Sequence, residues 1–366
     1  LQAEIIAHLE ALADARDNRG AFLERARQFH QTVTAMAAAR GEYGKIPLEV
    51  VFYRAQFFYY ALVLYILAFL LIAVQWLRPP KSGAGLLRAA NLGLVALPTV
   101  LLIAGIVMRS IIRGRPPVTT LYETILFCTA VAAAVSLFIE FMNRQRIALA
   151  VGALLGVAGM FLANKYEVSE GADTMPSMVA VLDTNFWLAT HVTTIAIGYG
   201  AGLLASAMAH VYVFGRLVGR IGRIGRIGPI EREERQRGLA RTVYGVLCFS
   251  LLFSVLGTVL GGIWANESWG RFWGWDPKEN GALMIVLWQL AILHARRGGL
   301  IGDLGVNLGV IAGGLVIAFS WFGVNLLGVG LHSYGFTSGT FAALAAFYAI
   351  EAVVIAAGAT TRERAS

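Results

Sequence analysis

The residues best suited to ligand chemistry are aromatic side chains crowded into one short segment. Residues 264–280 read WANESWGRFWGWDPKEN, with four tryptophans and one phenylalanine inside twelve positions. Indole rings favour the boundary between membrane and water, but such a belt accounts for only part of so dense a group. Gly270 and Gly274 allow the backbone to fold closely, so we expect a flat apolar platform for a planar, apolar ligand. The tryptophans of this platform are Trp264, Trp269, Trp273 and Trp275.

Two histidines flank this segment in the expected fold. His191 lies one turn into a predicted membrane span, in NFWLATHVTT, and His332 follows another, in NLLGVGLHSYG. Taken alone, either imidazole is more simply explained by a bond to a backbone carbonyl at the interface. Porphyrin iron, however, takes axial ligands from opposite faces, and imidazole is a common one. His191 and His332 beside the tryptophans therefore predict a heme clamp.

Two further histidines lie near the other ends of the predicted helices. His294 follows Lys278 by a helical length of about 24 Å, and His210 lies about 28 Å along its helix from His191. A second heme with His294 as an iron ligand is one hypothesis. The alternative places His294 in an interfacial belt with Arg296. For His210 we favour a structural role.

The residues after the last tryptophan have the pattern of a helix start. Asp276 is expected to cap a helix in which Pro277 occupies the first turn and Glu279 reaches back to the cap. This pattern explains part of the segment without any ligand. Lys278 and Arg271 are candidates to pair with the two propionates of a heme, because charged donors bind carboxylates strongly.

Membrane helices are the elements that must position these residues. The 366 residues are 57% hydrophobic and 14% charged, which excludes an ordinary soluble globular protein. Apolar runs long enough to cross about 30 Å of hydrocarbon predict an all-α, polytopic membrane protein with about nine transmembrane helices, the seventh the least secure. The predicted spans are 57–77, 89–108, 121–142, 147–163, 186–214, 243–264, 281–295, 305–327 and 339–358.

Basic residues indicate the orientation of these helices. Seventeen Lys and Arg residues fall in or near the loops on one side and six on the other, and the basic side of such proteins is cytoplasmic. The tryptophan-rich loop 264–280 is therefore expected to face the periplasm or outside of a bacterial inner membrane. We attribute the net charge of +8 to this bias and not to nucleic-acid binding. The Gly- and Arg-rich stretch 215–228 is only a weak phosphate-loop candidate, because no strand precedes it.

The predicted organisation includes an N-terminal segment outside the spans and a long loop between two spans. Apolar residues at helical spacing on both sides of Asn18 predict an amphipathic helical hairpin within residues 1–45. We expect residues 1–55 to form an extracytoplasmic amphipathic helical segment and 56–366 to form the transmembrane heme-handling domain. The start does not resemble a signal peptide. Residues 165–185 are expected to be a long outward loop that covers a site or docks a partner. The two cysteines fall inside predicted spans and suggest neither a disulfide framework nor a zinc site.

The segment from Trp269 to Glu279 resembles the tryptophan-rich WWD signature of the heme-handling membrane proteins of cytochrome c maturation. The chain is most similar to the CcsA family, also called ResC, a component of the System II cytochrome c synthase. Further support comes from Arg115-Pro116, from Leu121-Tyr122-Glu123 and from the sequence around His332. The similarity covers roughly residues 85–358.

This resemblance implies a function in cytochrome c biogenesis. Heme b (iron protoporphyrin IX) would be moved to an outer site held by His191 and His332 and presented for thioether attachment to the CxxCH motif of apocytochrome c. That is a holocytochrome c synthase (heme lyase) activity, expected only with a CcsB/ResB-like membrane subunit and with thiol-reducing proteins. The resemblance also implies that His294 ligates an intramembrane heme. The family's partner histidine for His294 is absent here, so a second polypeptide or His210 would supply it.

One alternative function remains open, and a second is disfavoured by the sequence. One is a heme exporter or chaperone that loads a carrier without forming a covalent bond. The other is a b-type electron-transfer subunit with two hemes stacked across the membrane. The second predicts paired histidines about thirteen residues apart on two helices, a spacing that this chain lacks.

Overall fold

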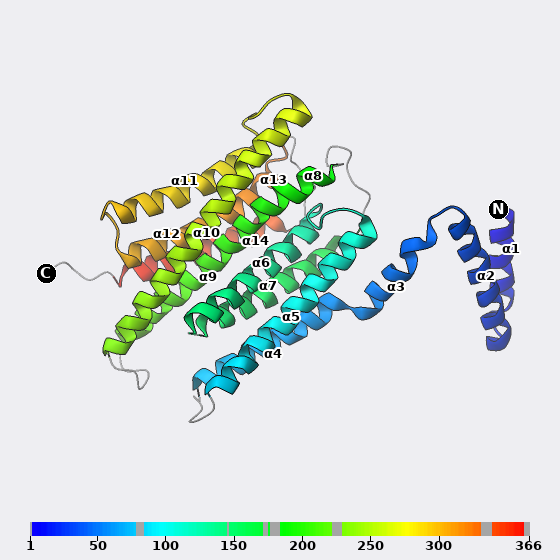
Figure 1. The fold of residues 1–366 in the computed structure, drawn as a ribbon, viewed down its shortest axis with the longest axis horizontal. Coiled ribbons are helices and arrows are strands. Elements are labelled where there is room, and N and C mark those ends of the chain that lie inside the picture. The colour runs from blue at the N-terminus through cyan, green and yellow to red at the C-terminus, as the bar shows by residue number, and fades with distance from the viewer. Residues whose placement is uncertain are drawn as a thin grey trace. The chain divides into compact units, whose positions relative to one another are not determined.

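The computed structural model describes residues 2–77, 84–144, 146–170, 175, 184–221, 229–330 and 339–361. These residues form helices and connecting turns without a strand, which confirms the predicted all-α class (Figure 1). The α-helices are α1 Gln2–Asp14, α2 Arg19–Ala39, α3 Ile46–Ala55, α4 Phe57–Leu77, α5 Ala84–Arg113, α6 Leu121–Asn143, α7 Ile147–Glu170, α8 Asn185–Trp187, α9 Thr193–Ile221, α10 Pro229–Trp269, α11 Pro277–Arg297, α12 Asp303–Ala318, α13 Val324–Leu326 and α14 Thr340–Ala359. A 3-10 turn, η1, covers Tyr43–Lys45, and two π-helical turns, η3 and η4, cover Leu188–Val192 and Phe319–Gly323.

The chain divides into two compact units, Leu1–Gln56 and Phe57–Ser366. In the first unit α1 packs on α2, as the sequence predicts for a hairpin. The side chain of Asn18 caps α2 by accepting hydrogen bonds from the backbone N–H groups of Gly20 and Ala21. His8 lies half-buried with its Nε2 3.2 Å from Oγ1 of Thr32. The placement of this unit at a membrane surface stays a prediction.

The second unit is a bundle of long helices that alternate in direction. Within it α9 packs against α10, α6 and α12, α4 against α5 and α7, and α11 against α10 and α12. Among the described residues, eight helical segments are long and apolar enough to cross a membrane, which confirms a polytopic membrane protein. We call the end of the bundle that carries Trp264–Glu279 the tryptophan end.

The seventh predicted span, 281–295, is helical as part of α11 but is not among those eight segments. Its polar residues explain why. Gln289 is buried and donates from Nε2 to Oγ of Ser250 on α10, which donates in turn to the carbonyl of Gly198 on α9. The polar side of α11 therefore faces its neighbouring helices, where interhelical hydrogen bonds replace apolar packing.

Two predicted boundaries are wrong. Helix α7 continues to Glu170, so the predicted outward loop 165–185 begins later, and residues 171–174 and 176–183 lie outside the described residues. Helix α10 starts at Pro229 and ends only at Trp269, so the predicted loop 264–280 shortens to Gly270–Asp276. Hydropathy follows the apolar part of a helix, whereas backbone hydrogen bonding continues through its polar ends.

Candidate functional site

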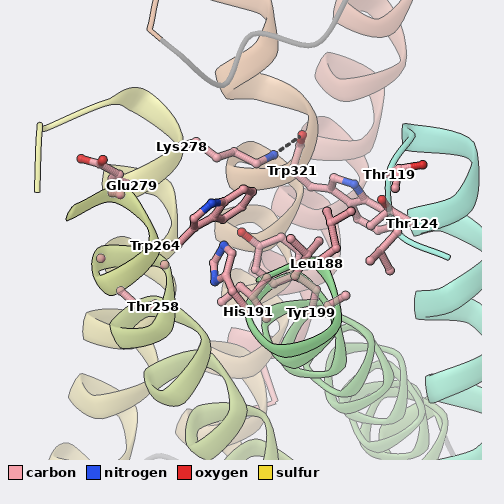
Figure 2. Close-up of a pocket in the computed structure, with 18 of the residues that line it drawn as sticks. Thr119, Thr124, Leu188, His191, Tyr199, Thr258, Trp264, Lys278, Glu279 and Trp321 are labelled. Atoms are coloured by element: carbon pink, nitrogen blue, oxygen red, sulfur yellow. Dashed lines mark hydrogen bonds between the residues drawn. The ribbon is translucent and has the colours of Figure 1, made fainter. Parts of the chain in front are cut away.

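A cavity of about 190 Å³ opens among the helices at the tryptophan end. It is bounded by the start of α6, by η3 and α9, by the end of α10, by the start of α11 and by η4. Figure 2 shows Trp264 between the imidazole of His191 and the side chain of Lys278 in this view. The side chains that dominate the wall are Leu121, His191, Tyr199, Trp264, Trp269, Trp273, Lys278 and Trp321.

The imidazole of His191 is fixed by a backbone carbonyl of the neighbouring helix. Its Nδ1 lies 2.8 Å from the carbonyl oxygen of Gly257 on α10. Because a carbonyl only accepts, Nδ1 carries the proton and the lone pair of the neutral ring is on Nε2. Metal-binding histidines commonly have this arrangement, in which the second ring nitrogen donates to a carbonyl or carboxylate. His191 therefore has the tautomer that an iron ligand needs.

Glycines on α10 make room for this imidazole. A methyl group at Gly261 would lie 2.6 Å from Cε1 of His191, and one at Gly257 would lie 2.8 Å from the backbone nitrogen of Ile195. Only glycine lets the two helices approach so closely at these points. The four-residue spacing of Gly257 and Gly261 puts both on the face of α10 that meets the start of α9.

Two buried tryptophans stand beside His191. Trp264 packs with its ring centroid 5.6 Å from that of His191. Trp187 lies one turn before His191 and donates from Nε1 to Oε2 of Glu267 at 2.8 Å. Trp264 is 7% exposed, and its Nε1 has no hydrogen-bond partner among the described residues. A buried indole N–H without an acceptor is unfavourable, so a ligand with an acceptor atom would complete this wall.

The sequence suggested that the aromatic side chains of residues 264–280 form one flat platform. The structure shows that they do not. Trp269 and Trp273 line the cavity with Trp264. Trp275 is 69% exposed, and its ring stands nearly perpendicular to that of Trp273. Phe272 is half exposed. The reason lies in the backbone, because left-handed φ angles at Gly270 (70°) and Trp275 (57°) turn successive side chains in different directions.

The predicted helix start is present at the beginning of α11. Asp276 accepts from the backbone N–H of Lys278, and Glu279 accepts from that of Asp276, which together form a capping box. Glu279 also accepts from the N–H of Gly274 at 2.8 Å and so holds the loop against the helix. This confirms the prediction from the Asp-Pro-Lys-Glu sequence.

Lys278 extends from this cap into the cavity wall. Its Nζ donates to the carbonyl oxygen of Trp321 on η4 at 3.1 Å (Figure 2). It precedes the predicted span 281–295, and burial lowers its pKa to about 8, although the nearby carboxylate of Asp276 opposes that shift. The ammonium has two more protons to donate. Arg271, the second predicted cation, is exposed and does not line the cavity.

A buried ion-pair network supports the opposite wall. Glu123, at the start of α6, is 2% exposed and accepts from Arg109 at 3.2 Å and from Arg113 at 2.5 Å. Its other oxygen accepts from the backbone and side chain of Thr119. The turn Gly114–Thr120, whose last residues line the cavity, is thereby held to both α5 and α6.

The remaining histidines differ in their surroundings. His332 lies outside the described residues, but Gly330, two positions before it, contacts the cap so closely that a methyl group there would lie 2.1 Å from Oδ2 of Asp276. His294 is exposed in the last turn of α11, with Nδ1 2.7 Å from the carbonyl of Leu290. His210 is engaged on both sides of its ring, by the carbonyl of Ser206 and, at 2.9 Å, by Oε2 of Glu351.

Two cavity residues, Tyr199 and Trp321, were not anticipated from the sequence, nor was Trp187, which packs with Trp264 but does not line the cavity. Trp187 could have been found, since it lies about one helical turn before His191. Trp321 and Tyr199 carry no comparable local signal, because they reach the cavity only through the packing of α9 against η4. As a whole, the described cavity wall combines a histidine whose Nδ1 is held by a backbone carbonyl, an apolar aromatic lining and one cation, Lys278.

The chain matches the family model described as "Cytochrome C assembly protein" over residues 118–332, which include every described residue of the cavity wall. It is similar to the cytochrome c biogenesis protein CcsA of Synechococcus sp. (strain CC9605), with 30% identity over 279 residues, 71% of this chain and 90% of the relative. With CcsA of Prochlorococcus marinus (strain MIT 9313) the identity is 31% over 304 residues, 75% of this chain and 93% of the relative. With CcsA of Trieres chinensis it is 28% over 258 residues, 63% and 81%.

Proposed function

The chain belongs to the cytochrome c assembly protein family, and on that premise we propose that it holds heme b at the tryptophan end and presents it to apocytochrome c. The observation that carries this proposal is His191, whose Nδ1 is bonded to the carbonyl of Gly257 beside the buried Trp264. In this proposal Nε2 of His191 binds the iron, and the indole N–H of Trp264 gains an acceptor from the ligand.

His332 is proposed as the second iron ligand. It follows Gly330 by two residues, a length of chain that spans at most about 7 Å. Gly330 itself contacts Asp276, at the cap that carries Lys278 into the cavity wall. This proximity in the chain supports a common site. Lys278 would then donate to a heme propionate.

The chemistry that follows is an addition of two thiols to the two vinyl groups of the heme. In each addition a carbon–sulfur bond forms, the S–H bond breaks, and the hydrogen goes to the other vinyl carbon, so no oxidant is needed. The chain contributes positioning. A bound porphyrin held in one orientation converts an encounter in solution into a reaction between adjacent groups. The histidine of the apocytochrome CxxCH motif would replace one of the two protein ligands.

The proposed setting is the bacterial inner membrane, with the tryptophan end toward the periplasm, as the basic residues of the opposite end indicate. A CcsB/ResB-like subunit and thiol-reducing proteins would act with the chain. That subunit would supply the partner of His294, because His210 is already engaged by Ser206 and Glu351.

The test is coexpression of the full chain with an apocytochrome c and a CcsB-like subunit. Covalent heme is scored by peroxidase staining of a denaturing gel. We expect a stained cytochrome band that depends on the chain. A purified chain that contains heme but yields no stained band with any subunit would instead favour a heme exporter without ligation activity.

Trp273 and Trp275 are expected to differ in their importance. Trp273 lines the cavity, whereas Trp275 is 69% exposed. Trp273→Ala should reduce the heme retained after purification by about tenfold, since a buried aromatic contact is worth more than about 1 kcal/mol. Trp275→Ala should retain heme within about twofold of the wild type. Heme-to-protein ratios of the two variants measure this, and equal losses in both would contradict the arrangement.

Heme affinity is also expected to depend on pH through Lys278. Its pKa of about 8 means that the ammonium is present at pH 7 and largely lost at pH 9. If it pairs with a propionate, affinity should fall by about tenfold between these values, as for the loss of a charge-assisted bond. Lys278→Arg remains charged throughout and is the control. Parallel pH profiles for wild type and Lys278→Arg would exclude this pairing.

A further inference from the structure

A second and larger cavity lies on the far side of the wall that closes the first. Its volume is about 490 Å³, within the range of about 300–1,000 Å³ typical of small-molecule sites. The first cavity, at about 190 Å³, falls below that range. The second cavity is an open pocket bordered by α6, α7, α9, the end of α12, η4 and α14, and its lining is almost entirely apolar.

The two cavities share Leu121 and Trp321 as wall residues. Trp321 is 7% exposed and stacks on Phe322 with ring centroids 4.8 Å apart and planes 29° apart. Both residues line the second cavity. Trp321 belongs to the π-helical turn η4, a geometry that is frequent at functional sites. A movement of the Trp321 side chain would join the two spaces.

Among its described lining residues, the second cavity has one cation, at its tryptophan end. Lys165, on the last turns of α7, lines it and has no ion-pair partner among the described residues. Leu155, ten residues earlier on the same helix, lines it about 15 Å deeper. The described lining contains no histidine, and the thiol of Cys128 already donates to the carbonyl of Ala196. A ligand here is therefore held by its apolar body and an anionic group, and not through a metal.

We infer that this second cavity is a side pocket for the porphyrin ring, with a carboxylate toward Lys165, from which the ring reaches His191 past Trp321. The inference rests on the proposed function. Four observations favour a porphyrin over an acyl chain. The lining includes the stacked pair Trp321 and Phe322, the volume suits a cofactor, Lys165 can pair with a carboxylate, and the cavity shares a wall with the His191 cavity. The pocket also explains how a site too small in this conformation receives its ligand.

Binding of metal-free protoporphyrin IX tests this pocket independently of the proposed iron site, because this compound has no iron and needs no axial ligand. We expect the full chain in lipid nanodiscs to bind it, as measured by porphyrin fluorescence, with an affinity that His191→Ala changes by less than about twofold. Ala343→Trp, which places a large ring in the pocket, should weaken binding by about tenfold or more. Lys165→Gln should weaken it by up to about fivefold, the most that an exposed ion pair contributes.

Ala346→Trp is the matched control, because Ala346 is an exposed residue of α14 that does not line the pocket. It should bind like the wild type. Equal porphyrin affinities for Ala343→Trp and Ala346→Trp would overturn the inference. A second contrary outcome is a phospholipid that copurifies with the wild type and is lost only from Ala343→Trp, while the porphyrin affinity of that variant is unchanged. Heme content of His191→Ala, measured separately with iron protoporphyrin, reports on the proposed function and not on this pocket.

Discussion

Replacing His191 with alanine is expected to lower the affinity of the purified protein for heme by about 100-fold. Loss of a group that merely orients a metal ligand typically costs about 10–100-fold, so loss of the ligand itself should reach the upper end. The remaining space is bordered by Gly261 and Trp264, which leaves room for a free imidazole. Added imidazole should therefore restore much of the heme and its absorption spectrum.

The control is His210→Gln on the same helix. The ring of His210 contacts Ser206 and Glu351, and a glutamine amide can still donate toward that carboxylate. Heme content should be unaffected by this change. A His191→Ala protein with the heme content and spectrum of wild type, in the absence of imidazole, would remove His191 from the site.

Gly261→Ala is expected to disturb heme binding without removing any ligand. The added methyl would lie 2.6 Å from Cε1 of His191, while the hydrogen bond to Gly257 holds the ring in place. Either the imidazole moves or α9 and α10 separate, and overpacking of this kind costs about 1–3 kcal/mol. Retained heme should fall by about tenfold or more, with a spectrum that shows altered axial ligation.

Gly245→Ala on the same helix is the comparison. A methyl group there meets nothing within 4 Å, so it should leave heme binding unchanged and favour the helix by up to about 1 kcal/mol. Heme-to-protein ratio, gel filtration and absorption spectra distinguish a local displacement from misfolding. Full heme content with an unaltered spectrum in Gly261→Ala would show that the close contact has no role in ligation.

Local chemistry made part of the fold predictable. The capping box at Asp276 depends on residues within three positions, so the sequence alone was sufficient for it. The all-α membrane class followed from long apolar runs. The ends of helices were harder to predict from the sequence, because α7 and α10 continue through polar residues that hydropathy assigns to loops.

The site depends on contacts between distant parts of the chain. His191 meets Gly257 across 66 residues, and Lys278 meets Trp321 across 43. No local rule predicts either pair. The sequence identified His191, Trp264 and Lys278 as individual candidates. It also predicted one flat aromatic platform, whereas the left-handed backbone angle at Trp275 leaves its ring nearly perpendicular to that of Trp273. The proposed pairing of His191 with His332 stays a prediction.

Because of the two π-helical turns, the direction in which side chains point depends on the number of residues in each turn as well as on their identity. Each turn accommodates one more residue than a regular α-helical turn. Deleting a single residue from Leu188–Val192 would leave a continuous helix, yet it would rotate everything before the deletion by about 100° relative to α9. Trp187 would then face away from Glu267. The same loss in Phe319–Gly323 would reorient one side of the wall between the cavities. A homologous chain could keep every side chain named here and still lack one of these extra residues. Its side chains before the missing residue would then contact different neighbours.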